Sequence, residues 1–521
     1  MRRREFLGTV SASILAGTLM GCSAGEKTLK GPTLQSPAGQ IRGQIVDQVH
    51  RFLGIPYAEA PFGKNRFVAP VARAPWEGIF EADDYGLICP QTGGGVGIDS
   101  FAEGEDCLNL NIWTPDPAAK GLPVMVWAHG GGQISGTGAS AVYDGTHFAK
   151  EGVVLVTNNR RLGAEGYLYL PELFGDGIGP GNLGILDQIE VLRWVQENIE
   201  SFGGDPNNVT LFGESGGGAA TQAVVATPES AGLLHRVIPQ SGGHAAQRPN
   251  TATQIARMAI DRVDIKPGDL DALRSLHWSA FPKIYDELQI PELGQPQTYL
   301  PVLGEDMPVH PVDASHQGVG LDLDYLIGTC RDEARLFTAL GMEIDGSQFG
   351  ERAQTLARAA GADWGNLIAA YKKSRPELDD DEAKIALVGD AWFRLPSIRI
   401  AEGHAQARKG NTFMYLFEWE SQLIGAAHAL DLAVFGNGMA FPGLAGFKSS
   451  EKVGTLMRKA WVNFARRGDP SIEGFKWPEY DLENRHTVSI NELLEVLADP
   501  YRLQREAFGE ALTMNWQQKK V

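Results

Sequence analysis

The chain has 521 residues, of which 43% are hydrophobic and 21% charged, proportions typical of a soluble globular protein. Its formal net charge of −18, with no basic run, excludes an electrostatic affinity for nucleic acids or anionic lipid head groups. No repeat or low-complexity tract divides the chain, so we expect one large core rather than a string of small domains.

The N-terminus predicts an export signal over residues 1–21. A basic end precedes an apolar stretch that is too short to span a bilayer comfortably. Arg3 to Leu7 resemble the twin-arginine pattern, which indicates export of an already folded protein. Leu19 to Cys22 resemble a bacterial lipobox, in which Cys22 becomes the lipidated first residue and a lipid anchor. We therefore expect residues 22–521 to form a single exported domain, periplasmic or extracellular.

Two of the four cysteines bracket a polar loop. Cys89 and Cys107 enclose residues 90–106, which are rich in glycine and contain little apolar surface to hold them in place. Because the export signal implies an oxidising compartment, a Cys89–Cys107 disulfide is favoured over two free thiols. Cys330 remains unpaired, and we interpret it as a buried, inert thiol.

The apolar segments predict a mostly parallel β-sheet flanked by helices. Residues 39–58 favour a small antiparallel hairpin. Farther along, short apolar runs without polar alternation are typical of strands covered on both faces. These runs are "PVMVWAHGGG", "GVVLVTNN", "NVTLFGES", "RVIPQSGG", "DYLIGTCRDE" and "TFMYLFEW". Residues 245–320 and 345–408 are charged and helix-like, and we expect them to be insertions that form a lid or pocket wall.

The glycine-rich stretch "WAHGGG" ends the first of these runs. It supplies the backbone amides of His129, Gly130, Gly131 and Gly132, which can approach a ligand closely because glycine has no Cβ. A phosphate-binding loop would also need Lys and Ser or Thr, which are missing. The alternative is an oxyanion hole, in which two of these amides join the amide of Gly216.

The stretch "TLFGESGGGAAT" contains Ser215 in the spacing G-x-S-x-G between a predicted strand and a predicted helix. This spacing is that of the nucleophile elbow, and the alternative is a glycine-rich loop with an incidental serine. A serine hydroxyl needs a base and a stabilised oxyanion to act as a nucleophile. In an α/β hydrolase, the acid and then the histidine follow the nucleophilic serine in the chain, so both are sought after Ser215.

Asp332 and Glu333 follow the run "YLIGTC" and so reach the carboxyl end of a strand. Position alone does not separate them, and a surface pair answering Arg331 and Arg335 is the alternative. Three histidines lie far enough along the chain to serve as the base. His428 is favoured because it lies in a loop soon after "TFMYLFEW". We expect the other two, His404 and His486, to lie on the solvated face of a helix and in a polar turn.

Three long segments are similar to the type-B carboxylesterase and cholinesterase family of α/β hydrolases. They are residues 52–67, 105–113 and 181–217, and the resemblance runs nearly from end to end after the export signal. It implies the α/β-hydrolase fold, a small-molecule ester substrate, and no metal or organic cofactor.

The resemblance also assigns individual residues. It implies that Glu333 is the triad acid, although Ala334 stands where the family usually has Gly. It implies that Gly131 and Gly132 are the loop donors of the oxyanion hole, while Gly216 replaces the usual Ala. Cys89 and Cys107 match the cysteines of the family's first disulfide loop.

These residues together predict a serine carboxylesterase with the triad Ser215, Glu333 and His428. Cleavage of amides or carbamates by the same triad is the runner-up. A non-catalytic binding module is disfavoured, because such relatives typically lack the serine or the histidine. Cholinesterases hold their cationic substrate on a Trp in the first disulfide loop, whereas residues 90–106 contain no Trp or Tyr. We therefore expect neutral, short-chain or aryl esters as substrates.

Overall fold

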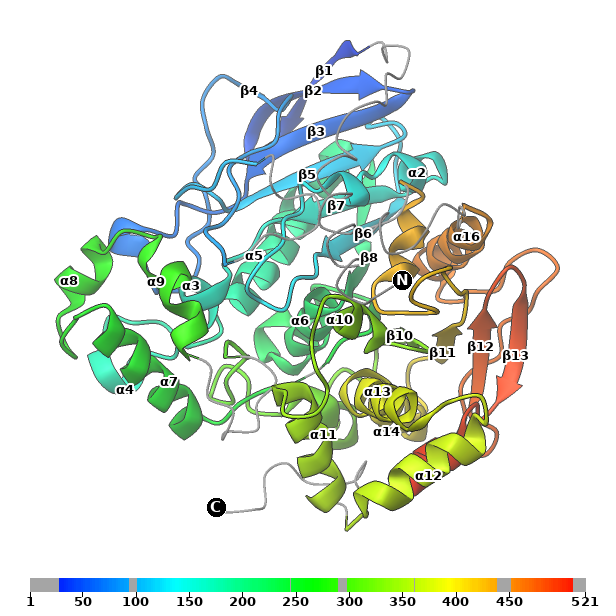
Figure 1. Cartoon of the computed structure of the whole chain (residues 1–521). Coiled ribbons are helices and arrows are strands. Elements are labelled where there is room, and N and C mark those ends of the chain that lie inside the picture. The colour runs from blue at the N-terminus through cyan, green and yellow to red at the C-terminus, as the bar shows by residue number, and fades with distance from the viewer. Residues whose placement is uncertain are drawn as a thin grey trace.

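The computed structural model describes residues 28–92, 101–243, 245–288, 298–359, 361–437 and 451–508. The predicted export signal, Cys22 and residues 93–100 lie outside the described residues. The centre of the molecule is a sheet of thirteen strands (Figure 1). The strands are β1 (Leu29–Ser36), β2 (Gly39–Val46), β3 (Val49–Pro56), β4 (Ile79–Glu81), β5 (Asn109–Thr114), β6 (Leu122–Ala128), β7 (Val154–Asn158), β8 (Gly204–Glu214), β9 (Arg236–Gln240), β10 (Asp324–Cys330), β11 (Thr412–Phe417), β12 (His486–Ile490) and β13 (Leu494–Ala498).

The middle of the sheet is parallel and its two edges are antiparallel. The strand order is β1-β2-β3-β5-β7-β6-β8-β9-β10-β11-β12-β13, with β4 beside β2. All neighbours from β7 to β12 run parallel, while β1, β2, β3 and β5 form an antiparallel extension and β13 pairs antiparallel with β12. This arrangement confirms the predicted mostly parallel sheet and the hairpin over residues 39–58.

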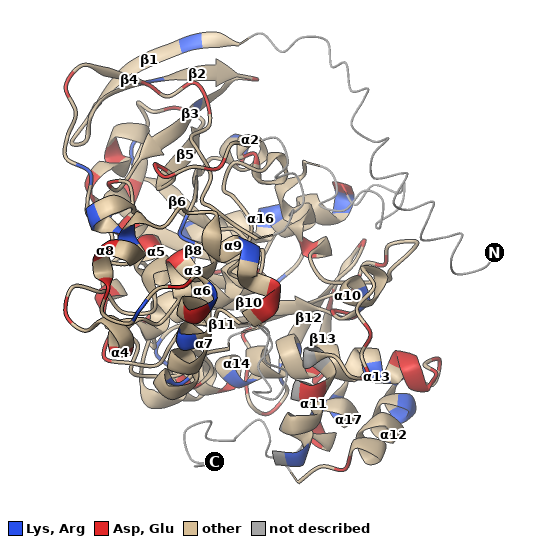
Figure 2. Cartoon of the chain, turned by 60° about the vertical axis from the view of Figure 1, so that its left-hand side comes forward, with Lys and Arg blue, Asp and Glu red and all other residues tan. Residues whose placement is uncertain are grey.

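The central parallel strands, such as β6, β7, β10 and β11, are buried on both faces, as the continuous apolar runs predict. Successive side chains of a strand point to opposite faces. In β6, Val124 and Val126 join one hydrophobic core, and Met125 and Trp127 join the other. The first core is completed mainly by helices α5 (Leu183–Asn198), α6 (Gly216–Ala226) and α14 (Leu395–Ala407), the second by α2 (Thr146–Lys150) and α16 (Glu451–Arg467). Figure 2 shows charged residues on the outer helices and edges, while the central strands are largely uncharged.

The two predicted insertions are helical, and Figure 1 shows their helices on the side of the molecule away from β1 and β2. The first contains α7 (Pro249–Arg262), α8 (Leu270–Ser275) and α9 (Ala280–Ile284). The second contains α11 (Gln348–Ala359), α12 (Trp364–Ser374), α13 (Asp380–Gly389) and a π-helical segment, Asp390–Arg394, that leads into α14. The other α-helices of the described residues are α3 (Gly163–Tyr167), α4 (Pro171–Phe174), α10 (Arg335–Ala339) and α17 (Arg502–Ala507).

Two expectations about histidines were wrong. His404 lies on α14 as predicted, but it is fully buried rather than solvated, because its ring packs on Tyr325 and its Nδ1 bonds the Thr412 hydroxyl at 2.8 Å. His486 does not lie in a turn but is the first residue of β12. The polar residues before it made the start of this strand look like part of a turn. Across the described part of the chain, no helix combines the length and the apolar character needed to cross a bilayer.

Candidate active site

Ser215 stands at a sharp turn between β8 and α6. Its φ of 56° lies in the left-handed region, which is strained for a residue with a side chain and typical of an elbow nucleophile. A Cβ on Gly217 would lie 1.8 Å from the carbonyl oxygen of Ala128, and one on Gly213 would lie 2.6 Å from the same atom. Only glycine therefore fits at these two positions, as the spacing predicted.

Three predicted residues meet at the carboxyl end of the sheet. His428 Nε2 lies 2.8 Å from Ser215 Oγ, and His428 Nδ1 lies 2.5 Å from Glu333 Oε2. His428 and Glu333 are buried, while the serine is half-buried. In this arrangement Ser215 donates a hydrogen bond to one ring nitrogen, and the other ring nitrogen donates to the carboxylate.

The two adjacent acids have different partners. The second oxygen of Glu333 accepts from the Ser241 hydroxyl and the Cys330 amide, both at 2.7 Å, so this carboxylate is fixed in orientation. Asp332 instead bonds the guanidinium groups of Arg331 and Arg375, each at 2.7 Å. Burial opposes ionisation of Asp332, but the two cations lower its pKa below the usual range. Neither acid belongs to an exposed surface pair.

The predicted oxyanion-hole peptides are held by their carbonyl groups. A peptide's C=O and N–H point in opposite directions, so anchoring the carbonyl of one residue aims the amide of the next. Gly130 O bonds His129 Nδ1 at 2.8 Å, and Gly131 O accepts from the amides of Ile134 and Ser135. Similarly, the carbonyl of Ser215 accepts from the amide of Ala219 at 3.0 Å.

These bonds orient the amides of Gly131, Gly132 and Gly216. Among the described residues, the first two amides have no hydrogen-bond acceptor, and the third lies at the first turn of α6, where amides lack intrahelical partners. A Cβ on Gly216 would lie 2.8 Å from Gly132 N, so the two segments are in close contact. The three amides are thus available to a ligand atom beside Ser215.

Glu214 is a buried acid that the sequence analysis missed. Its Oε1 lies 3.2 Å from His428 Nε2, the same nitrogen that contacts Ser215. Burial raises the pKa of Glu214 to about 8, against the opposing attraction of His428. Burial also opposes protonation of His428, but the carboxylates of Glu214 and Glu333 outweigh it and raise its pKa to about 9. The position of Glu214 immediately before the serine was the available signal.

Two aromatic rings pack beside the histidine. The ring centroids of Phe393 and Phe337 lie 4.7 and 5.2 Å from that of His428. Phe393 belongs to the π-helical segment of the second insertion, so this part of the insertion packs against His428. The sequence carried no signal for these two residues, because ring directions in an insertion depend on how its helices pack.

The cysteine pair predicted to be bonded is close in space. Cys89 and Cys107 are buried with their sulfur atoms 3.0 Å apart, and both are free thiols in this structure. Burial and the contact with Cys107 raise the pKa of Cys89 well above its usual value. The disulfide stays a prediction. Cys330 is buried, as expected, at the end of β10.

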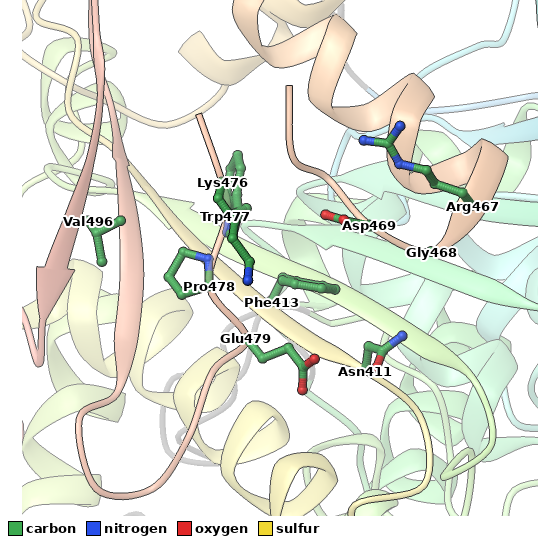
Figure 3. Close-up of a pocket in the computed structure, with 10 residues that line it drawn as sticks. All are labelled: Asn411, Phe413, Arg467, Gly468, Asp469, Lys476, Trp477, Pro478, Glu479 and Val496. Atoms are coloured by element: carbon green, nitrogen blue, oxygen red, sulfur yellow. The ribbon is translucent and has the colours of Figure 1, made fainter. Parts of the chain in front are cut away.

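One pocket lined by described residues lies away from this site. It has a volume of about 500 Å³ and lies at the amino end of β11, between α16 and β13 (Figure 3). Its lining combines Phe413 and Trp477 with the charged residues Arg467 and Lys476 and none of the site residues above. The part of the chain that the structure describes contains no group of three or more His, Cys, Asp or Glu side chains suited to a metal ion.

The parallel sheet, the strained elbow and the hydrogen-bonded serine, histidine and glutamate define an α/β hydrolase. The model of the carboxylesterase family matches residues 30–508. The chain belongs to this family and is a carboxylic-ester hydrolase.

Individual relatives agree with this membership. The chain is 35% identical to para-nitrobenzyl esterase of Bacillus subtilis over 90% of its length and 96% of that protein. It is 30% identical to phenmedipham hydrolase of Pseudarthrobacter oxydans, with 88% and 95% of the two chains covered. Among solved structures, a carboxylesterase of Geobacillus stearothermophilus superposes with a TM-score of 0.81 at 34% identity, covering 91% of this chain and 99% of that one.

Glu214→Gln should shift the pH dependence of catalysis toward acid. The Glu214 carboxylate raises the pKa of His428, so its removal lowers that pKa and leaves the imidazole neutral at lower pH. A general base must be neutral, so the acid limb of the kcat/KM profile reports the pKa of His428. In the parent enzyme this limb should lie at a higher pH than the pKa of an ordinary histidine. In the variant it should lie at a lower pH than in the parent.

The control is Glu190→Gln, which alters a buried glutamate that bonds Arg193 away from the site. Its acid limb should coincide with that of the parent. An acid limb that stays in place, or moves to higher pH, in Glu214→Gln would contradict this electrostatic role.

Proposed function

We propose that the enzyme hydrolyses neutral esters through an acyl-enzyme formed on Ser215. The observation that carries this proposal is the continuous pair of hydrogen bonds from Ser215 through His428 to Glu333. Ser215 is the nucleophile, His428 is the general base and acid, and Glu333 holds the imidazole and stabilises its protonated form. The bonds of Asp332 to two arginines favour Glu333 as the acid.

In the first half of the reaction, Ser215 Oγ attacks the ester carbonyl carbon while His428 Nε2 takes the hydroxyl proton. The carbonyl oxygen becomes negative and accepts hydrogen bonds from the amides of Gly131, Gly132 and Gly216. The bond to the alcohol then breaks, and His428 gives its proton to the departing oxygen. The alcohol leaves, and the acyl group remains bonded to Ser215.

In the second half, water repeats these steps on the acyl-enzyme. His428 takes a proton from the attacking water, and the same three amides bind the second oxyanion. The bond between the acyl carbon and Ser215 Oγ then breaks, and the serine recovers a proton from His428. The carboxylic acid product leaves and the enzyme returns to its starting state.

Neutral, short-chain or aryl esters are the proposed substrates. The rings of Phe393 and Phe337 beside His428 offer apolar contact to an uncharged group. Cholinesterases hold their cation on a Trp in the loop between the two cysteines. Here that loop has one aromatic residue, Phe101, which already packs edge-to-face on Tyr85. The similarity to para-nitrobenzyl esterase supports esters that carry an aromatic ring.

Carbamates are the second candidate substrates. The similarity to phenmedipham hydrolase supports this alternative, because the same nucleophile and oxyanion hole can act on a carbamate carbonyl. The two candidates share every catalytic residue and differ in how fast the acylated serine is released.

We also propose that the protein is exported and carries a disulfide between Cys89 and Cys107. The twin-arginine-like start supports export, and the lipobox-like segment supports a lipid on Cys22. The 3.0 Å separation of the two sulfur atoms supports the disulfide, because the thiols are already within reach of one another.

Ser215→Ala and His428→Ala should each reduce ester turnover by about 10⁴-fold or more, because the members of a triad act as a unit. Glu333→Gln should also reduce kcat strongly. The matched control is Asp332→Asn, which weakens the ion pairs with Arg331 and Arg375. This variant should have a lower melting temperature, but its loss of kcat should be much smaller than that of Glu333→Gln. Substantial turnover by either alanine variant, or a larger loss in Asp332→Asn than in Glu333→Gln, would contradict the assignment.

A substrate panel tests the proposed specificity. Nitrophenyl esters of increasing acyl length, phenmedipham, acetylthiocholine and a neutral isostere of matched size would be compared by kcat/KM. The neutral isostere should be hydrolysed at least as well as the choline ester. A preference of tenfold or more for the choline ester, about 1.4 kcal/mol, would refute the neutral-substrate proposal. Faster turnover of phenmedipham than of every ester would favour the carbamate alternative.

The proposals on export are tested on protein produced with its own N-terminus in a bacterial host. Mass spectrometry of a non-reduced digest should show a peptide that joins Cys89 to Cys107 and an N-terminal peptide that begins at a lipid-modified Cys22. Free thiols at both positions in exported protein would refute the disulfide. An unprocessed N-terminus in the cytoplasm would refute the export proposal.

A further inference from the structure

Gln133 directly follows the glycine loop and bridges the loop to the nucleophile elbow. Its side chain is buried, with 2% of its surface exposed, and its Nε2 donates to the carbonyl oxygen of Gly216 at 2.7 Å. Gly216 supplies one proposed oxyanion amide, and the two residues before Gln133 supply the other two. The Gln133 amide therefore links the two segments of chain that would form the hole.

The direction of this amide is fixed by its other end. Gln133 Oε1 accepts from the Tyr167 hydroxyl at 2.8 Å and from Arg160 Nη2 at 3.2 Å. The same Arg160 nitrogen also donates to the carbonyl of His129 at 2.9 Å, at the start of the loop. Because both donors lie on the oxygen side, the amide nitrogen must face Gly216. The backbone carbonyl of Gln133 is held as well, by the amide of Gly163 at 2.7 Å.

The bridge spans a contact that is unusually close. A Cβ on Gly216 would lie 2.8 Å from Gly132 N and 3.2 Å from Gln133 N, so an alanine there would force the loop outward. In the family that the sequence resembles, alanine is usual at this position. The absence of a side chain at 216 and the bond from Gln133 thus act together, since one permits the close approach and the other holds it.

We propose that Gln133 is a positioning residue that sets the spacing of the oxyanion hole by holding the glycine loop against Gly216. This inference rests on the proposed function, in which the Gly131, Gly132 and Gly216 amides bind the oxyanion. A fixed spacing lets all three donors reach the oxyanion without rearrangement, and that stabilisation is greater in the transition state than in the planar ester.

Gln133→Met tests the proposal, because methionine has a similar shape and can form none of the three hydrogen bonds. We expect kcat to fall by at least about tenfold while KM changes little, because an interaction specific to the transition state is lost. The inhibition constant of a trifluoromethyl ketone, which forms a tetrahedral adduct on the serine, should rise by a similar factor. Binding of a non-reacting methyl ketone of the same shape should not change.

Gln222→Met is the matched control. Gln222 is also fully buried, donates to a backbone carbonyl, that of Pro311, and accepts from a tyrosine hydroxyl, that of Tyr325. It lies on α6 away from the glycine loop. The Gln222→Met substitution should lower the melting temperature about as much as Gln133→Met does. It should not weaken binding of the trifluoromethyl ketone relative to binding of the methyl ketone. An equal weakening in both variants would show that Gln133 acts only through stability.

Gln133→Glu serves as a second variant in case the methionine variant does not fold. Its carboxylate can still accept from Tyr167 and Arg160 but cannot donate to Gly216, so we expect the same loss of kcat. Parental kcat and parental trifluoromethyl ketone affinity in a folded variant at position 133 would overturn the proposal.

A double-mutant cycle with Gly216→Ala tests the coupling. In the parent background this substitution should lower kcat/KM, because the loop is held where the new Cβ must lie. In the Gln133→Met background the additional loss should be smaller, since the loop can move away; fully additive losses would contradict the proposal. Labelling of Ser215 by a fluorophosphonate in every variant distinguishes a failure of this proposal from a failure of the proposed function. The proposed function fails only if Ser215 of the parent enzyme is not the residue that reacts.

Discussion

The contact between the end of β6 and the elbow after β8 governs the whole site. These two parallel strands are paired in register, with Ala128 beside Gly213, and the carbonyl of Ala128 lies where side chains on Gly213 and Gly217 would be. Because the strands end together, the glycine loop that leaves β6 reaches the serine that leaves β8. The proposed nucleophile and the proposed oxyanion donors therefore depend on one strand pairing. The histidine and the glutamate follow strands farther along the sheet.

Much of this arrangement could be predicted from the residues alone. Strands buried on both faces need unbroken apolar runs, so six of the parallel strands could be predicted from the sequence. The elbow could be predicted from its glycine spacing, because only glycine fits on either side of Ser215. Chain order then restricted the acid and the base to the segments after β10 and β11. These features depend on local sterics and on strand ends, which a sequence displays directly.

Other features depend on packing between distant segments and could not be predicted. Asp332 and Glu333 are neighbours at the same strand end, and distant segments supply their different partners. Arg375 of the second insertion bonds Asp332, whereas Ser241 and His428 bond Glu333. His404 has an amphipathic context, yet the Tyr325 ring from β10 covers it. The link between Gln133 and Gly216 joins residues 83 positions apart and leaves no pattern of spacing.

The sequence distances within the site also determine when it can form. Ser215 and His428 are 213 positions apart, and His428 and Glu333 are 95 positions apart. Helices form within about a microsecond, whereas pairings this distant require long loops to close and are slow. During refolding, helical content and collapse should therefore recover long before turnover does. Recovery of activity in this protein therefore shows that the distant segments have come together. It detects late folding steps that optical probes of secondary structure do not detect.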